Sequence, residues 1–192
     1  MFRMIVVVAA VVTLLALVGV ASAGNAHFAG KPRAPTFNDL GTDLRTRVDV
    51  AGLGNFSTEL DVTANGTASG TSTCANNGGN EAPGQNPAAF PVTASGTIAV
   101  PASDIKNGRV QITVTSSTSP LVFTKAGAPD CPNPGWTETV TITDVAFSSA
   151  TVAVTQDTNN NNLFEESPAL SATCTFSPNT SNGPVPVANV SC

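Results

Sequence analysis

The chain has 192 residues, with 8 Lys and Arg against 13 Asp and Glu and a formal net charge of −5 at pH 7. Charges of either sign are few and the basic residues form no run, which argues against nucleic acid and anionic membrane surfaces as partners. The length suits one domain large enough to bury a core.

The first 23 residues have the pattern of a secretory signal peptide. Arg3 supplies a positive charge, an apolar run extends from Ile5 to Val20, and Ala21-Ser22-Ala23 offers the small residues that signal peptidase accepts. The run is about 16 residues long, shorter than the roughly 20 that a spanning helix needs. We therefore expect cleavage after residue 23 and a secreted protein with no membrane attachment. A retained N-terminal anchor is the alternative.

Residues 24–35 are expected to form a flexible leader before the first strand. They contain His27, the only histidine of the chain. A Ser-His-Asp site needs its histidine held on a packed element. The sequence therefore gives no support to nucleophilic catalysis.

Alternation of apolar and polar residues predicts β-strands through the rest of the chain. The runs with this period lie at residues 44–50, 60–63, 92–100, 109–115, 139–143, 150–154 and 170–176. About seven or eight strands at this spacing are typical of a sandwich. We expect an all-β fold, an antiparallel β-sandwich that is immunoglobulin-like in outline, over residues 36–192.

The connections between these runs carry turn chemistry. Residues 52–55, Gly-Leu-Gly-Asn, predict a tight turn, and residues 101–108 predict a single helical turn that ends at Asn-Gly. Two longer Pro- and Asn-rich loops are expected at residues 75–89 and 119–135. Residues 177–191 form a similar tail.

The four cysteines are Cys74, Cys131, Cys174 and Cys192. An even number in an exported chain implies disulfides, with three possible pairings. We favour Cys74–Cys131 and Cys174–Cys192, the second being a local bridge that ties down the last residue. No Cys-x-x-Cys pair occurs, so a zinc site is not indicated.

Three segments are distinctive: Ala51–Asn55, Cys74–Pro87 and Gly127–Thr137. Together they resemble a family of small secreted bacterial proteins of unknown function, over most of residues 36–176. The resemblance implies a lone exported β-domain, and it transfers no activity or site residues. Trp136 follows Cys131, whereas antibody-type domains place the tryptophan between the two bonded cysteines.

One segment could bind calcium. Asp157, Asn159 and Asn161 place oxygen atoms at positions 1, 3 and 5 of a possible loop, and Glu165 falls at position 9. The sixth and twelfth positions lack the glycine and glutamate of an EF-hand. The alternative is an asparagine-rich turn, because Asn tolerates a left-handed backbone and caps turns. Calcium is the one cofactor that we consider, and otherwise we expect none.

A ligand-binding surface is predicted where the two long loops meet. If Cys74 bonds Cys131, residues 75–89 and 128–136 lie side by side, and their side chains can both donate and accept hydrogen bonds. The alternatives are a rigid Ω-loop that covers one end of the core, and a tryptophan that packs on the disulfide. The predicted surface consists of Asn76, Asn80, Gln85, Asn86, Asp130, Asn133 and Trp136.

These features favour a secreted, non-enzymatic binding or surface-interaction domain. Its ligand would be extracellular, either a glycan or a component of the cell envelope. A structural, envelope-coating protein is the alternative, suggested by the abundance of Thr, Ser and Asn. A third hypothesis, an extracellular hydrolase, needs two carboxylates about 5–10 Å apart across a cleft.

Overall fold

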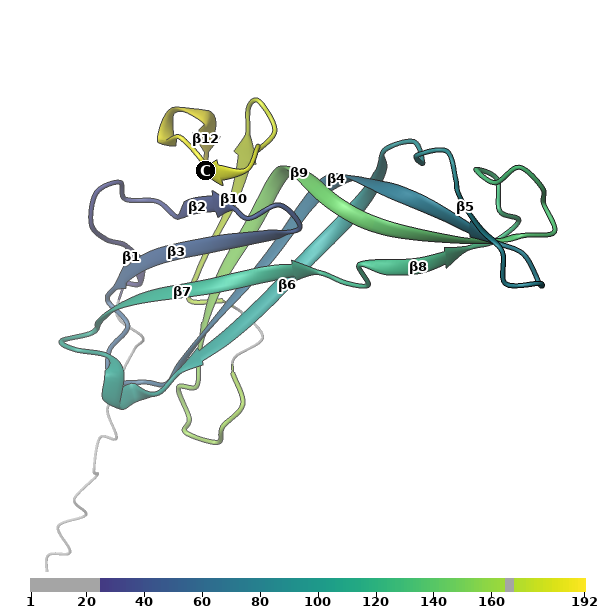
Figure 1. The fold of residues 1–192 in the computed structure, drawn as a ribbon. Helices are drawn as coiled ribbons and strands as arrows, with labels where there is room; N and C mark the ends of the chain where they lie inside the picture. Colours follow the sequence, from purple (N-terminus) through teal and green to yellow (C-terminus); the bar gives the residue numbers. More distant parts are fainter. Residues whose placement is uncertain (1–24, 165–167) are drawn as a thin grey trace, which may run out of the picture.

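The computed structural model describes residues 25–164 and 168–192, and over these residues the protein is all-β (Figure 1). Twelve strands form one antiparallel sheet, in the order β11-β2-β3-β7-β6-β4-β9-β10-β12. Strands β1, β5 and β8 attach to β3, β4 and β9. The predicted signal peptide, residues 1–23, lies outside the described residues. Where the chain is described, no helix has the length and apolar character to cross a membrane.

The strands and the two short 3₁₀ turns have these bounds: β1 His27–Phe28, β2 Thr36–Asp39, β3 Asp43–Ala51, β4 Thr58–Ala75, β5 Glu81–Pro83, β6 Phe90–Val100, η1 Ala102–Asp104, β7 Arg109–Thr118, β8 Val122–Lys125, β9 Thr137–Gln156, β10 Leu170–Phe176, β11 Gly183–Pro184, η2 Val187–Asn189 and β12 Val190–Ser191.

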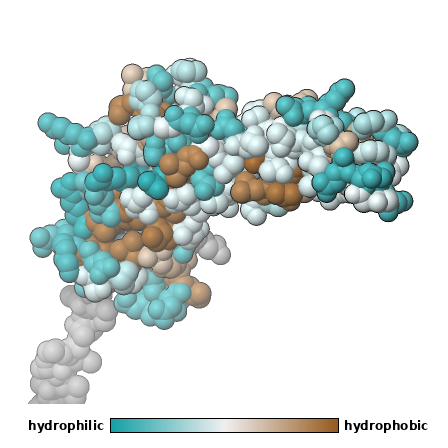
Figure 2. All heavy atoms as spheres, in the orientation of Figure 1, coloured by the Kyte–Doolittle hydropathy of each residue, from teal (hydrophilic) through white to brown (hydrophobic). Residues whose placement is uncertain are grey.

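The sheet curls into a half-barrel at the junction between β6 and β7 (Figure 1). These two strands pair only at Ala94↔Thr118 and Ser95↔Ser117, whereas β7 pairs with β3 along its whole length. Beyond the junction β6 and β7 diverge. The inward-facing Ile98 of β6 is consequently 39% exposed, and apolar surface is visible between β7 and β6 in Figure 2.

Hydrogen bonding around the junction is continuous, so the strands form one curled sheet and not two separate ones. The predicted two-sheet sandwich and its immunoglobulin-like outline are therefore not confirmed, while the predicted all-β antiparallel class is. The reason lies in the β6–β7 hairpin. The pairing of β6 with β7 joins the strands β11, β2, β3 and β7 to the strands β6, β4, β9, β10 and β12. Sequence periodicity identifies each strand but not which strands pair.

The core lies inside the curl and holds the inward residues of every long strand. Its largest fully buried side chains include Phe147, Leu44 and Leu60. Complete burial of such a side chain stabilises the fold by about 1.5–3 kcal/mol. Phe37 of β2 meets Phe176 of β10 edge to face, with ring centroids 4.9 Å apart, so the two ends of the curled sheet touch.

The C-terminal tail closes the space between these ends. The backbone N–H of Thr180 donates to the carbonyl of Phe147 at 2.8 Å. Its hydroxyl accepts the N–H of Phe147 at 2.9 Å and donates to the buried carboxylate of Asp39. The Cys174–Cys192 disulfide then fixes the end of the chain. The segment expected to be a simple tail is thus tied into the core.

The predicted leader also has structure in its described part. Residues His27 and Phe28 form β1, which pairs with Val50 and Ala51 of β3. Ala26 and Phe28 pack against the core.

Strands β4 and β9 extend beyond the rest of the sheet as an arm, flanked at its far end by β5 and β8 (Figure 1). Two register shifts interrupt the β4–β9 ladder, between Asn65 and Gly66 and between Ser69 and Gly70. Each leaves an extra residue on β9, so its buried positions change from even numbers to odd and back again. These shifts explain why the sequence predicts two strands, 139–143 and 150–154, where the structure has one.

Gly96 permits the close approach of β6 and β7, because a Cβ there would lie 2.3 Å from the carbonyl oxygen of Thr115. We expect Gly96→Ala to lower the free energy of unfolding by about 1–3 kcal/mol, since the methyl group must push the strands apart. Chemical denaturation followed by circular dichroism measures this change. The exposed neighbour gives the control: Ser95→Ala should stay within about 0.5 kcal/mol of the wild type. Equal unfolding midpoints would contradict the close approach.

Candidate functional site at the tip of the arm

Both predicted disulfides are present. Cys74, in β4, is completely buried and bonds Cys131 of the loop between β8 and β9, with their Cα atoms 5.7 Å apart. Next to this bridge the N–H of Gln85 donates to the carbonyl of Asp130 at 2.9 Å. The two long loops therefore lie side by side at the tip of the arm, as the sequence predicts for this pairing.

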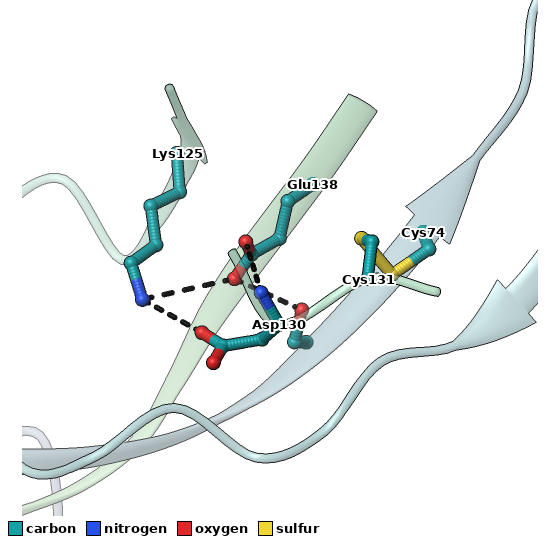
Figure 3. A network of polar contacts seen from close by, with 6 residues as sticks. Cys74, Lys125, Asp130, Cys131 and Glu138 are labelled. Atoms are coloured by element: carbon teal, nitrogen blue, oxygen red, sulfur yellow. Dashed lines mark hydrogen bonds and ion pairs between the residues drawn. A yellow bond between two sulfur atoms is a disulfide. The ribbon is translucent and has the colours of Figure 1, made fainter. Parts of the chain in front are cut away.

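A buried carboxylate anchors the second loop (Figure 3). Glu138 of β9 has no exposed surface, and it accepts hydrogen bonds from the Ser72 hydroxyl at 3.1 Å and the Asp130 N–H at 3.2 Å. The ammonium of Lys125 lies 2.7 Å from Asp130 Oδ2 and 4.0 Å from Glu138 Oε1. The hydrogen bond from Lys125 lowers the pKa of Asp130 below its ordinary 3.8, so this ion pair persists at neutral and mildly acidic pH.

The joined loops enclose a small concavity. Its volume is about 360 Å³, and it is lined by Pro83, Gly84, Gln85, Pro129, Asp130, Cys131 and Pro132. A second hollow of about 440 Å³ lies beside it and is lined by Thr71, Ser72, Thr73, Glu81, Ala82, Pro83, Gly84 and Asn86. Gly84 lines both and is packed so closely that a Cβ would lie 2.5 Å from the Ser72 hydroxyl. Rigid prolines and a disulfide thus line the concavity, and Gln85 and Asp130 are its polar side chains.

Three of the seven predicted ligand-binding residues line the two hollows. Gln85 and Asp130 line the concavity, and Asn86 lines the second hollow. Asn76 instead shapes its own turn, because its Oδ1 accepts the N–H groups of Gly78 and Asn80.

Asn80 belongs to the turn of Asn76, to whose Oδ1 its N–H donates at 3.0 Å, and Asn133 and Trp136 lie in the segment that precedes β9. Asn133 accepts the N–H of Gly135 with its side chain and that of Trp136 with its carbonyl. Trp136 is half-buried and directly precedes Thr137, whose pairing with Ala75 ends the β4–β9 ladder. Trp136 and Asn76 therefore both lie at the tip of the arm.

The predicted calcium-binding segment is an ordered turn. The buried carboxylate of Asp157 accepts the N–H groups of Asn161 and Asn162, at 3.0 and 2.8 Å. The side chains of Asn159 and Asn161 accept further backbone N–H groups of the same turn. Glu165 lies outside the described residues. Among the residues that the structure describes, no three His, Cys, Asp or Glu side chains gather as metal ligands.

The single histidine and the closely spaced carboxylates of the arm lie on different elements. His27 lies in β1, where its Nδ1 is 2.7 Å from the carbonyl oxygen of Asn25. Asp130 and Glu138 share Lys125, but Glu138 is sealed from solvent. A carboxylate without solvent access serves the structure of the arm and has no route to a substrate.

Sequence reasoning overlooked Glu138 and Lys125. A usable signal was present, because Glu138 precedes Val140 and Ile142 by steps of two and so falls on the inward face of its strand. A carboxylate on an inward face requires partners. The partners of Glu138 depend on the tertiary structure, because Asp130 belongs to the loop that the Cys74–Cys131 disulfide holds beside β4.

Comparison with known proteins found no matching family model, no matching curated protein and no matching solved structure.

Removal of the charge of Glu138 should loosen the arm. We expect Glu138→Gln to lower the free energy of unfolding by about 1–3 kcal/mol, because the amide keeps one acceptor oxygen and presents an NH2 group at the other position, where the Asp130 N–H or the Ser72 hydroxyl loses its acceptor. Hydrogen exchange should rise within residues 125–138. Glu81→Gln, an exposed change on β5 of the same arm, is the control and should alter neither quantity. Unchanged exchange in the Glu138 variant would show that the network does not hold the loop.

Proposed function

We propose that this protein is exported by a signal peptide at residues 1–23 and acts outside the cell as a non-enzymatic binding domain. The observation that carries the proposal is the concavity at the tip of the arm, into which Gln85 and Asp130 bring polar groups and which is held by the Cys74–Cys131 disulfide and by buried Glu138. Two disulfides suit an oxidising, extracellular environment. The resemblance to a family of small secreted bacterial proteins supports export, and it transfers no activity.

The chemistry of the tip suits a polar, uncharged ligand such as a sugar of a glycan or of the cell envelope. The amide of Gln85 can both donate and accept hydrogen bonds, which is what sugar hydroxyls require. The carboxylate of Asp130 adds an acceptor. Because prolines and a disulfide already order these loops, binding would lose little conformational entropy.

A screen of neutral glycans, insoluble polysaccharides and isolated cell envelopes tests this function. We expect saturable binding that falls about tenfold or more in Gln85→Ala, because the change removes a side chain that lines the concavity, and that falls by a smaller factor in Trp136→Ala, at the edge of the tip. Ser103→Ala, an exposed change in η1 outside the arm, is the control and should bind like the wild type. Binding that survives both tip variants would overturn the assignment of the site, and binding to none of the surfaces would overturn the function.

A second candidate, an envelope-coating protein, is favoured by the outer face of β6, β4, β9 and β10. The cross-strand register lines up hydroxyl-bearing side chains there, and no aromatic ring interrupts them among these positions. A broad, uniformly polar face suits contact with neighbouring copies or with a hydrated polymer. The three rows are Thr93–Asn65–Ser149–Thr175, Ser95–Thr63–Thr151–Thr173 and Thr97–Asp61–Ala153–Ser171.

Sedimentation velocity over a range of protein concentrations distinguishes this candidate. A coat-forming protein should show a sedimentation coefficient that rises with concentration, because identical faces meet more often. Thr63→Lys/Thr151→Lys should abolish this rise by placing like charges in the middle of the face. A single monomeric species at every concentration would exclude the coating role.

A further inference from the structure

The basic side chains of this acidic protein gather on one side. The described residues contain seven Lys and Arg: Lys31, Arg33, Arg45, Arg47, Lys106, Arg109 and Lys125. Four of them, Lys31, Arg45, Arg47 and Arg109, lie on the outer face of β3 and β7 and on the β1–β2 loop beside it. We call this surface the basic face.

The strand register produces this gathering. Arg45 and Arg47 occupy alternate, outward positions of β3, opposite Thr115 and Thr113 of β7. Arg109 enters β7 opposite Ala51, at the end where β1 also joins β3. Figure 2 shows hydrophilic side chains around the β1–β2 loop and the adjoining end of β3.

Two further cations adjoin the basic face. Arg33 belongs to the same β1–β2 loop, and Lys106 forms a bridge pair with Arg109. Six of the seven described cations therefore lie on or next to one surface, while Lys125 is on the distant arm. The same side also carries Asp43 and Asp49 on β3 and Asp104 in η1. Six cations against these three carboxylates leave the β3–β7 side locally positive in a chain with a net charge of −5.

Most of this positive charge is not neutralised internally. Arg109 is paired with Asp49, to which its Nε donates at 2.8 Å, and this contact holds the pKa of Asp49 below its ordinary value. Arg47 donates to the neutral side chain of Gln111. Within the described residues, no carboxylate lies at ion-pair distance from Lys31, Arg45 or Arg47.

A polar pocket opens in the middle of the basic face. It has a volume of about 190 Å³ and lies between the β1–β2 loop and the outer side of β3 and β7. Its polar lining consists of Lys31, Thr36, Arg47, Asp49 and Gln111. A guanidinium carries five N–H donors in a planar fork that matches a carboxylate, and Gln111 occupies only one of those of Arg47.

We propose that the basic face binds an acidic polysaccharide, with a carboxylate of the polymer seated between Lys31 and Arg47. Arg45 and Arg109 continue the track of positive charge along and across the strands. Hydroxyl and amide groups between the cations, on Thr113, Thr115 and Gln111, can bind the sugar hydroxyls.

The same face lacks the features that other polyanions require. Single-stranded nucleic acid is bound by aromatic rings on which bases stack, and none of the outward positions of β3 and β7 carries one. Membrane surfaces bind basic patches that also present apolar side chains, and these outward positions are polar or charged apart from Ala51. The alternation of Arg with Thr and Gln suits a charged sugar chain.

Binding of the disulfide-intact protein to polygalacturonate, a carboxylated polysaccharide, tests the proposal, with neutral dextran and oligothymidylate as comparison ligands. We expect saturable binding to polygalacturonate that weakens as salt is added, no binding to dextran, and weaker binding to oligothymidylate. Arg45→Gln/Arg47→Gln should weaken binding roughly tenfold at low salt and should flatten its salt dependence, since two exposed charge contacts are lost.

Glu59→Gln/Asp61→Asn is the matched control, because it also neutralises two outward charges, on β4 in the other half of the sheet. Its affinity for polygalacturonate should not fall. Equal affinity of the arginine double variant and the wild type, with both melting cooperatively, would overturn the proposal. Tighter binding to oligothymidylate than to polygalacturonate would also overturn it, in favour of a nucleic acid. The tip of the arm is tested with neutral glycans, so either site can fail independently of the other.

Discussion

The pairing of β4 with β9 is the constraint on which the rest of the molecule depends. Residues 58–75 of one strand run against residues 137–156 of the other, so a single ladder crosses the core and continues into the arm. Within the body this ladder carries β6 on one side and β10 on the other. Within the arm it carries β5 and β8. A two-stranded ribbon is marginally stable in water, so the arm needs the flanking strands, the Cys74–Cys131 disulfide and the buried Glu138 network to keep one shape.

The curl of the sheet depends on contacts at two places, the β6–β7 junction and the approach of β2 to β10. At the β6–β7 junction the ladder narrows to two residue pairs, and the sheet can bend there because Gly96 leaves room for the backbone of β7. At the opposite side the Phe37–Phe176 contact joins β2 to β10, and the hydrogen bonds of Thr180 to Asp39 and Phe147 join β2 to β9 through the C-terminal tail. Hydrophobic burial supplies most of the stability of such a curl, while these polar contacts determine where it closes.

Much of the fold and part of the candidate site could be predicted from the sequence. The period-two runs identified the antiparallel β class. The cysteine positions favoured both disulfides, because Cys174–Cys192 is a local bridge that ties down the last residue. They also brought the loops around Gln85 and Asp130 together. The curl of the sheet was not predictable, since local periodicity assigns residues to strands and faces but not strands to neighbours. Glu138 was overlooked for the same reason, as its partners come from a strand and a loop that are distant in sequence.

The sequence by itself determined the strand class and the inward and outward faces of the long strands, because these depend on side-chain alternation, and it favoured the disulfide pairing that the structure has among three possible ones. Only the tertiary structure decided where the charges lie. Lys31, Arg47 and Arg109 are separated by many residues in a chain with no basic run, and the sequence therefore argued against nucleic acid and anionic membrane surfaces as partners. Antiparallel pairing of β3 with β7, and of β1 with β3, places them on one face. Electrostatic fields depend on distances in space, which the order of residues alone does not contain.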